Sequence, residues 1–243
     1  MGSSWSQSGS NGEEEVVVRE SFNVDRDVIS ARDWSAEELL GYTGIISSKV
    51  SLRSNMPSLY TSIPRCSSVA CAVSLLISYD CATLFRPSVD FLQECMLGTE
   101  LVYTPRVAFK AIRTHGVCSE EVYNSTQVDG KASRQAYVEA SDCTGIEYWC
   151  VRYLSGIKRA IASGFPVLGC LELDSAPATE NVEPSATGSV ALVITGFDDL
   201  SSVLEVAHCD GSGTYGEVAY SAAGSLHSLW IVRGGAFENM LVD

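Results

Sequence analysis

Positive charge is scarce in this sequence. The 243 residues include 16 Lys and Arg against 30 Asp and Glu, which gives a formal net charge of −14 at neutral pH. No run of basic residues interrupts this acidic excess. Because a phosphate backbone is repelled by such a surface, nucleic acid is excluded as the main partner. We expect the partners to be other proteins.

Signals for secretion, membrane insertion and metal binding are also missing. No apolar stretch reaches the ~18 residues of a membrane-spanning helix, and the first residues lack the apolar core of a secretory signal. The nine cysteines form no Cys-x-x-Cys pair, so we expect no metal and no cofactor. Their odd number and their placement in apolar runs indicate reduced thiols in a cytosol-like compartment, with one disulfide pair as the alternative.

The N-terminus forms a polar tail over residues 1–15. Its start, Met-Gly-Ser-Ser-Trp-Ser, matches the N-myristoylation pattern with Gly2 as the acceptor. A merely flexible Gly/Ser start is the alternative. One acyl chain gives marginal membrane affinity, and Glu13–Glu15 oppose binding to an acidic surface. Many copies in one assembly would offset this weakness through avidity.

Helical patterns fill the first half of the chain and strand patterns the second. Capping residues and apolar spacing predict the helices, and short apolar runs between Gly and Asp turns predict the strands. This order indicates an α+β fold, and 46% hydrophobic residues suffice for one large domain at residues 16–243. The expected helices are 35–42, 67–81, 86–97, 105–116 and 153–164; the expected strands are 16–24, 165–173, 189–199, 202–209, 216–221 and 227–234.

The stretch "PRCSSVACAVSLLISYD" (64–80) predicts a buried helix whose first turn carries a thiol and hydroxyls. From Val69 to Ile77 almost every residue is apolar. A polar group at this position either caps the helix or serves as a nucleophile, since a helix N-terminus lowers the pKa of a thiol. Cys66 and Ser68 are the two candidates for a nucleophile.

The order of segments resembles the papain-like (C1-type) cysteine peptidases, in the short form of bacteria and large DNA viruses. The resemblance spans residues 60–232 and is carried by "YLSGIKRAIASGFPVLGCLEL" (153–173), "GSVALVITGFDD" (188–199) and "LEVAHCDGSGTYGEVAYS" (204–221). It implies a two-lobe fold. A helical lobe at about 30–150 would surround the central buried helix, and a C-terminal antiparallel β-barrel-like lobe would follow at about 151–235.

The resemblance also implies where four site residues would lie, and none has the family's identity. Aligning the central helix by its apolar pattern puts Ser68 at the nucleophilic Cys position and Ser62 at the oxyanion Gln position. Val190 falls where the His base belongs, and His208 falls at the orienting Asn position. A serine needs an adjacent base, which Val190 cannot provide. We therefore expect no catalytic residues and a pseudoenzyme, that is, not an enzyme.

Two other functions stay open. A shift of the alignment by two residues makes Cys66 the nucleophile, and either Cys66 or Ser68 would then work with His208 in an active hydrolase with a rearranged dyad. Alternatively, the chain is a soluble module that binds an extended peptide in the former substrate cleft.

Within the family the resemblance is to proteins of large nucleocytoplasmic DNA viruses such as iridoviruses. It implies a structural protein of the virion, a minor capsid component near the inner membrane. The partners would then be capsid proteins in an assembly, with membrane contact through an acyl chain on Gly2. We expect the protein in the virus particle or the host cytoplasm.

Overall fold

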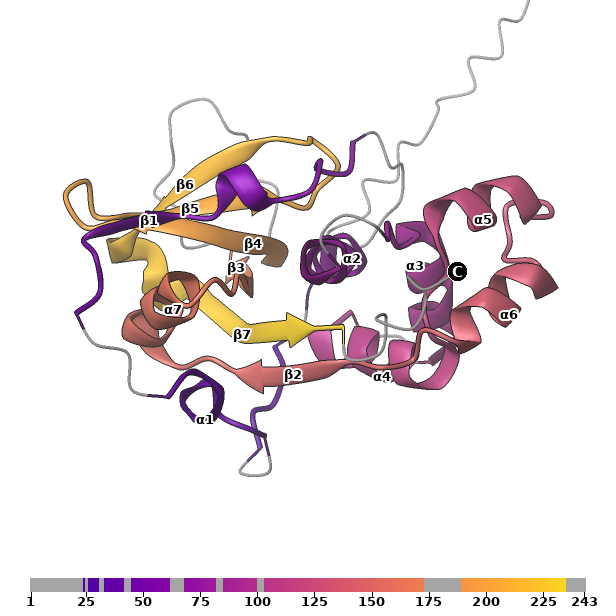
Figure 1. Ribbon diagram of the computed structural model, residues 1–243, viewed down its shortest axis with the longest axis horizontal. Coiled ribbons are helices and arrows are strands. Elements are labelled where there is room, and N and C mark those ends of the chain that lie inside the picture. The colour runs from indigo at the N-terminus through magenta and orange to yellow at the C-terminus, as the bar shows by residue number, and fades with distance from the viewer. Residues whose placement is uncertain are drawn as a thin grey trace, which may run out of the picture.

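A single antiparallel sheet of seven strands forms the frame of the protein in the computed structural model (Figure 1). The structure describes residues 24, 26–30, 33–41, 45–61, 68–81, 85–99, 103–172 and 189–234. The strand order is β2-β7-β3-β4-β5-β6, and β1 pairs with β4 beside this path. The strands are β1 (Lys49–Ser51), β2 (Glu147–Cys150), β3 (Val167–Glu172), β4 (Ser189–Asp198), β5 (Val203–His208), β6 (Tyr215–Ala219) and β7 (Leu226–Arg233).

Helices cover both faces of this sheet. Helix α2 packs against β4 and β7 with α3 and α4 behind it, whereas α7 packs on the other side against β1, β3 and β4 (Figure 1). Each face has its own apolar core: residues such as Val193 meet α2, and residues such as Ile194 meet α7. The helices are α1 (Ala36–Leu40), α2 (Ser68–Asp80), α3 (Val89–Thr99), α4 (Pro105–His115), α5 (Glu120–Thr126), α6 (Arg134–Ser141) and α7 (Tyr153–Ala162).

The α+β fold expected from the sequence is confirmed, with one refinement. The predicted β-barrel-like lobe is an open sheet, since the strand path has two ends, β2 and β6. The division into a tail at 1–15 and lobes at 30–150 and 151–235 stays a prediction. The tail, and all of the predicted strand 16–24 except Val24, lie outside the described residues.

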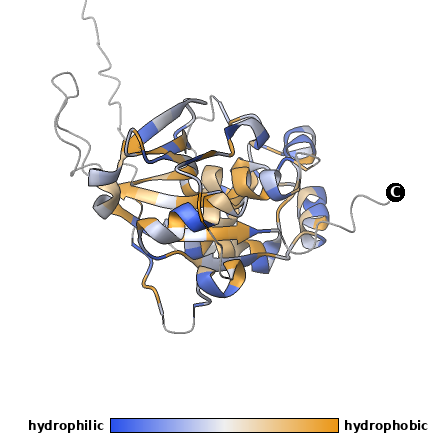
Figure 2. Cartoon of the chain, turned by 60° about the vertical axis from the view of Figure 1, so that its left-hand side comes forward, coloured by the Kyte–Doolittle hydropathy of each residue, from blue (hydrophilic) through white to orange (hydrophobic). Residues whose placement is uncertain are grey.

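Helix α2 is buried on all sides, as its sequence predicts. Every residue from Ser68 to Ser78 is buried, because the sheet lies on one side and α3 and α4 lie on the other. Figure 2 shows the apolar residues gathered in the interior and the polar ones toward the periphery. No helix among the described residues combines the length and apolar character needed to cross a bilayer.

Local signals define helix α4 at both ends. The Thr104 hydroxyl accepts a hydrogen bond from the Val107 amide at 3.3 Å, and Pro105 occupies the first turn. Gly116 ends the helix with φ of 78°, and a Cβ atom there would collide with the Ala140 carbonyl. These residues fix the length of α4.

Candidate functional site

The N-terminal end of α2 meets the beginning of β4. The Ser68 hydroxyl accepts a hydrogen bond from the Ala191 amide at 3.0 Å, and only 1% of Ser68 is exposed. Val190 precedes Ala191 in β4 and pairs with Leu171 in β3. Ser68 and Val190 therefore lie at the same end of the sheet, as their alignment with the papain-like site requires.

His208 ends strand β5 at this same end of the sheet. It pairs with Leu192 of the antiparallel strand β4, and its amide donates a hydrogen bond to the Thr214 carbonyl at 3.0 Å. The imidazole lies over Gly216, where a Cβ atom would overlap Nε2. Side chains alternate between the two faces along β4 and β5, so His208 and Val190 share the face opposite to that of Ala191.

Asp210 is the acidic group near His208. Burial by itself raises the pKa of Asp210, but its pKa lies below the ordinary value overall. Ser212 donates hydrogen bonds to the carboxylate, including one from its amide at 2.9 Å, and the nearby His208 favours the ionised form.

The loop after His208 contacts the chain segment that precedes α2. Thr61 forms an antiparallel bridge with Ser212, and its side chain lies where a Cβ atom of Gly213 would be. Ser62 and Cys66 belong to residues 62–67, which lie outside the described residues. The two described ends of this segment, Thr61 and Ser68, both adjoin the end of the sheet that carries His208.

The buried cysteines are poor nucleophiles. Burial raises the pKa of Cys95, Cys118 and Cys143 to about 12. The pKa of Cys209 lies well above its usual value because Cys71 interacts with it and because it is buried. A thiol must lose its proton to attack a substrate, so these side chains are packing residues. Among the described residues, no group of His, Cys, Asp and Glu could hold a metal ion.

His227 lies closer to the site than the sequence indicated. Its Nε2 atom is 3.1 Å from the Ser189 hydroxyl at the start of β4, and its Nδ1 atom is 3.0 Å from the Ser228 hydroxyl. Burial lowers the pKa of His227, and Arg26 adds to this effect. Only the pairing of β3 with both β4 and β7 brings His227 here, so no local pattern could have revealed it.

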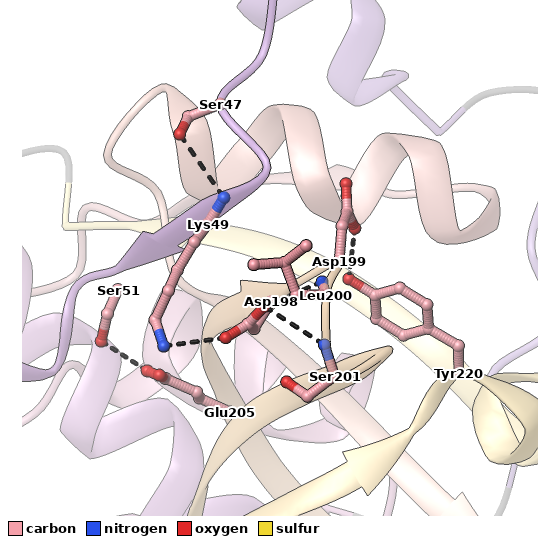
Figure 3. A network of polar contacts seen from close by, with 9 residues as sticks. All are labelled: Ser47, Lys49, Ser51, Asp198, Asp199, Leu200, Ser201, Glu205 and Tyr220. Atoms are coloured by element: carbon pink, nitrogen blue, oxygen red, sulfur yellow. Dashed lines mark hydrogen bonds and ion pairs between the residues drawn. The ribbon is translucent and has the colours of Figure 1, made fainter.

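The Asp198–Asp199 pair stabilises a turn at the far end of β4 (Figure 3). Asp198 accepts hydrogen bonds from the amides of Leu200 and Ser201, at 2.9 and 3.4 Å, and pairs with Lys49 at 2.8 Å. These hydrogen bonds, with that of Lys49 the largest, lower the pKa of Asp198. Turn formation accounts for this carboxylate without a catalytic role.

Comparison with solved structures supports the fold assignment. Xylellain, a cysteine protease from Xylella fastidiosa, superposes with a TM-score of 0.68 at 20% identity, covering 88% of this chain and 96% of that chain. Digestive procathepsin L2 from the larval midgut of Tenebrio molitor gives 0.66 at 16% identity, covering 88% and 78%. ProCathepsin B from Trypanosoma congolense gives 0.61 at 14% identity, covering 88% and 87%. By sequence, no protein-family model and no curated protein matches the chain.

The prediction that the chain is not an enzyme is contradicted by this comparison, because the solved structures that share its fold are cysteine proteases and their proforms. That prediction depended on an alignment that puts Ser62, Ser68, Val190 and His208 at the four site positions, and above all on Val190 at the position of the base. The structure gives the Ser68 hydroxyl a structural role, a buried hydrogen bond to the Ala191 amide. A serine in that role does not show that the nucleophile has been lost.

Proposed function

We propose that this protein is a papain-type hydrolase of peptides that uses Cys66 as the nucleophile and His208 as the general base. The observation that carries the proposal is that Thr61 and Ser68 are both anchored at the end of the sheet where His208 lies. Cys66 precedes Ser68 by two residues in the sequence, and it belongs to the segment that joins these two anchored ends.

The chemistry follows from these residue types. His208 accepts the proton of the Cys66 thiol, and the thiolate attacks the peptide carbonyl carbon. The imidazolium then protonates the leaving amine as the C–N bond breaks, which leaves an acyl group on sulfur. Water releases the acyl group as His208 takes its proton and returns it to the thiolate.

Two activity probes test the nucleophile. A peptide epoxide that reacts with thiols is expected to label Cys66, and peptide mapping by mass spectrometry locates the label. A serine-reactive fluorophosphonate is expected to leave Ser68 unmodified, because its hydroxyl is buried and hydrogen-bonded. Cys81→Ala, which removes a half-buried thiol, is the matched control for Cys66→Ala.

The base is tested by replacing histidines. His208→Ala is expected to slow labelling of Cys66 about 100-fold or more, the usual contribution of a general base. His227→Ala is the matched control and is expected to preserve most of the rate. The proposal is wrong if Cys66 stays unlabelled in the native protein, or if His208→Ala leaves the labelling rate unchanged.

The role in a virus particle is a separate proposal, supported by the resemblance to iridovirus proteins and by the Gly2 motif. It has its own measurement: the intact mass of the native protein should show loss of Met1 and a myristoyl group on Gly2. Gly2 lies outside the described residues. An unmodified N-terminus would remove the membrane anchor, and absence of the protein from purified particles would remove the capsid role.

A further inference from the structure

Residues 26–30 form a strap against strands β3 and β7 that is held mainly by polar contacts. Its apolar side chains contribute little to packing, since 84% of Val28 and 42% of Ile29 are exposed. The Asp27 amide donates a hydrogen bond to the Ser228 hydroxyl of β7 at 2.9 Å. A segment with so little apolar burial opens at a low free-energy cost. Its polar contacts therefore decide whether it stays on the sheet.

An irregularity in β7 brings two successive side chains together beneath the strap. The pairing of β3 with β7 shifts register between Leu168 and Cys170, and Ser228 has a φ of 50°. Successive side chains of a regular strand point to opposite faces, but here the His227 Nδ1 atom lies 3.0 Å from the Ser228 hydroxyl. A buried serine keeps this left-handed conformation only where its surroundings hold it. The irregularity thus places His227 next to the group that anchors the strap.

The ring of His227 joins two buried hydroxyl groups. Nδ1 lies 3.0 Å from the Ser228 hydroxyl, and Nε2 lies 3.1 Å from the Ser189 hydroxyl. A neutral imidazole has one donor and one acceptor, so one of the two hydroxyls donates to the ring whichever nitrogen carries the proton. A second proton turns both nitrogens into donors, and that hydroxyl loses its acceptor. Protonation therefore breaks one link in the chain of hydrogen bonds that ends at the Asp27 amide.

The surroundings of His227 also oppose a second proton. Burial lowers the pKa of His227, and the positive charge of Arg26 lowers it further. Glu172 has the opposite effect, but its carboxylate accepts a hydrogen bond from the Arg26 Nε atom at 2.9 Å. Cys170, the partner of His227 in β3, stays neutral because burial raises the pKa of its thiol. The ring takes up a proton more readily once the strap has left it, so acid favours the open form.

Asp27 is the carboxyl group of the strap, and its titration works against that of His227. It accepts a hydrogen bond from the Trp230 indole at 2.9 Å and a second from the Arg106 amide at 3.4 Å. Burial raises the pKa of Asp27 although these hydrogen bonds oppose the shift. Uptake of a proton by Asp27 therefore favours the closed strap as pH falls. Asp27→Asn removes this opposing effect, keeps an oxygen for the Trp230 indole and isolates the response of His227.

We propose that residues 26–30 are an acid-sensitive strap, which leaves the sheet when His227 becomes protonated. The Trp230 indole, which donates to Asp27 in the closed form, then meets water. The strap lies beside the start of β4, at the same end of the sheet as the candidate site. It is independent of the proposed hydrolase, because none of these hydrogen bonds involves His208.

Hydrogen exchange of the full chain, followed by NMR, tests the strap. Two protons report its opening: the backbone amide of residue 27 and the indole N–H of Trp230. Their protection, corrected for the intrinsic effect of pH on exchange, should fall between about pH 7.5 and about pH 5.5. The fall is expected to reach up to about tenfold, the limit for one proton over one pH unit below the ordinary pKa of 6.5. Asp27→Asn should show a larger fall, and the Val193 amide in β4 should keep its protection.

His227→Gln keeps a donor and an acceptor but does not titrate, so its protection should no longer fall in acid. The matched control is His115→Gln at the end of α4, which should behave like the native protein. Arg26→Gln removes an exposed charge that opposes protonation, so the fall should be smaller, and this variant also serves if His227→Gln fails to fold. Constant protection in both the native and the Asp27→Asn proteins, a parallel loss at Val193, or an unchanged fall in His227→Gln would overturn the proposal.

Discussion

The imidazole of His208 lies against the α-carbon of Gly216. The two residues belong to neighbouring strands, β5 and β6, in which Val206 is the direct partner of Gly216. A Cβ atom on Gly216 would overlap the Nε2 atom of the ring. The position of this ring therefore depends on the absence of a side chain at residue 216.

Gly216→Ala should displace the His208 ring. If His208 is the base for Cys66, the labelling rate of Cys66 should fall about tenfold or more, because a general base must lie within hydrogen-bonding distance of the proton that it removes. A shift of the His208 ring resonances in NMR spectra reports the movement directly. Gly98→Ala is the control, because no atom of the described residues lies within 4 Å of a Cβ atom there. Moved resonances with an unchanged labelling rate would argue against His208 as the base.

Ser68→Ala should destabilise the fold without abolishing labelling of Cys66. The substitution leaves the Ala191 amide without its partner at the junction of α2 and β4. A buried donor left without an acceptor costs about 1–3 kcal/mol in the free energy of unfolding. Chemical denaturation measures this loss. Loss of labelling in a variant that remains folded would instead point to Ser68 as part of the reacting machinery.

Ser74→Ala should have the opposite effect on the same helix. Ser74 is fully buried in α2, and no hydrogen-bond partner for its hydroxyl exists in the described part of the chain. Alanine removes the buried hydroxyl and is a better helix former. The free energy of unfolding is expected to rise by about 0.5–1 kcal/mol. A decrease in the same denaturation experiment would mean that the hydroxyl has a partner.

Asp27 should make the protein less stable as pH rises from its ordinary pKa of 3.8 through its raised pKa in the native state. Burial raises the pKa of this carboxyl from its ordinary 3.8, although hydrogen bonds from Thr104, Trp230 and Arg106 oppose the shift. Between the ordinary and the raised pKa the native state binds more protons than the unfolded state, so the free energy of unfolding falls as pH rises through this window.

Asp27→Asn should remove that contribution while keeping an oxygen to accept the Trp230 hydrogen bond. The difference in unfolding free energy, variant minus native protein, is expected to increase with pH from about 3.8 upward and then to level off. Urea denaturation at a series of pH values measures it. Parallel curves for the two proteins would contradict the raised pKa.

The sequence predicts those elements whose causes are local. Thr104, Pro105 and Gly116 predict α4 within one residue of its observed bounds. The apolar runs at 165–173 and 189–199 likewise predict strands β3 and β4. Strands β1 and β2 have three and four residues and form only because distant strands pair with them. Helices α5 and α6 were also missed, although Ser119 and Ser133 cap them.

The candidate site also has one part that the sequence predicts and another part that depends on contacts between distant residues. The order of segments was enough to predict that Ser68, Val190 and His208 lie at one end of the sheet. It could not show that the Ser68 hydroxyl binds the Ala191 amide, because residues 123 positions apart make that contact. The assignment of Ser68 to the nucleophile position stays a prediction.

The burial of α2 has a consequence for synthesis on the ribosome. This helix is apolar on all sides, but the strand that covers it begins at Ser189, more than a hundred residues later in the chain. Synthesis proceeds at about 5–20 residues per second, so several seconds or longer pass between the emergence of α2 and the emergence of β4. During that interval its apolar surface is open to chaperones and to other nascent chains, so the yield of native protein should depend on holdase capacity in the producing cell.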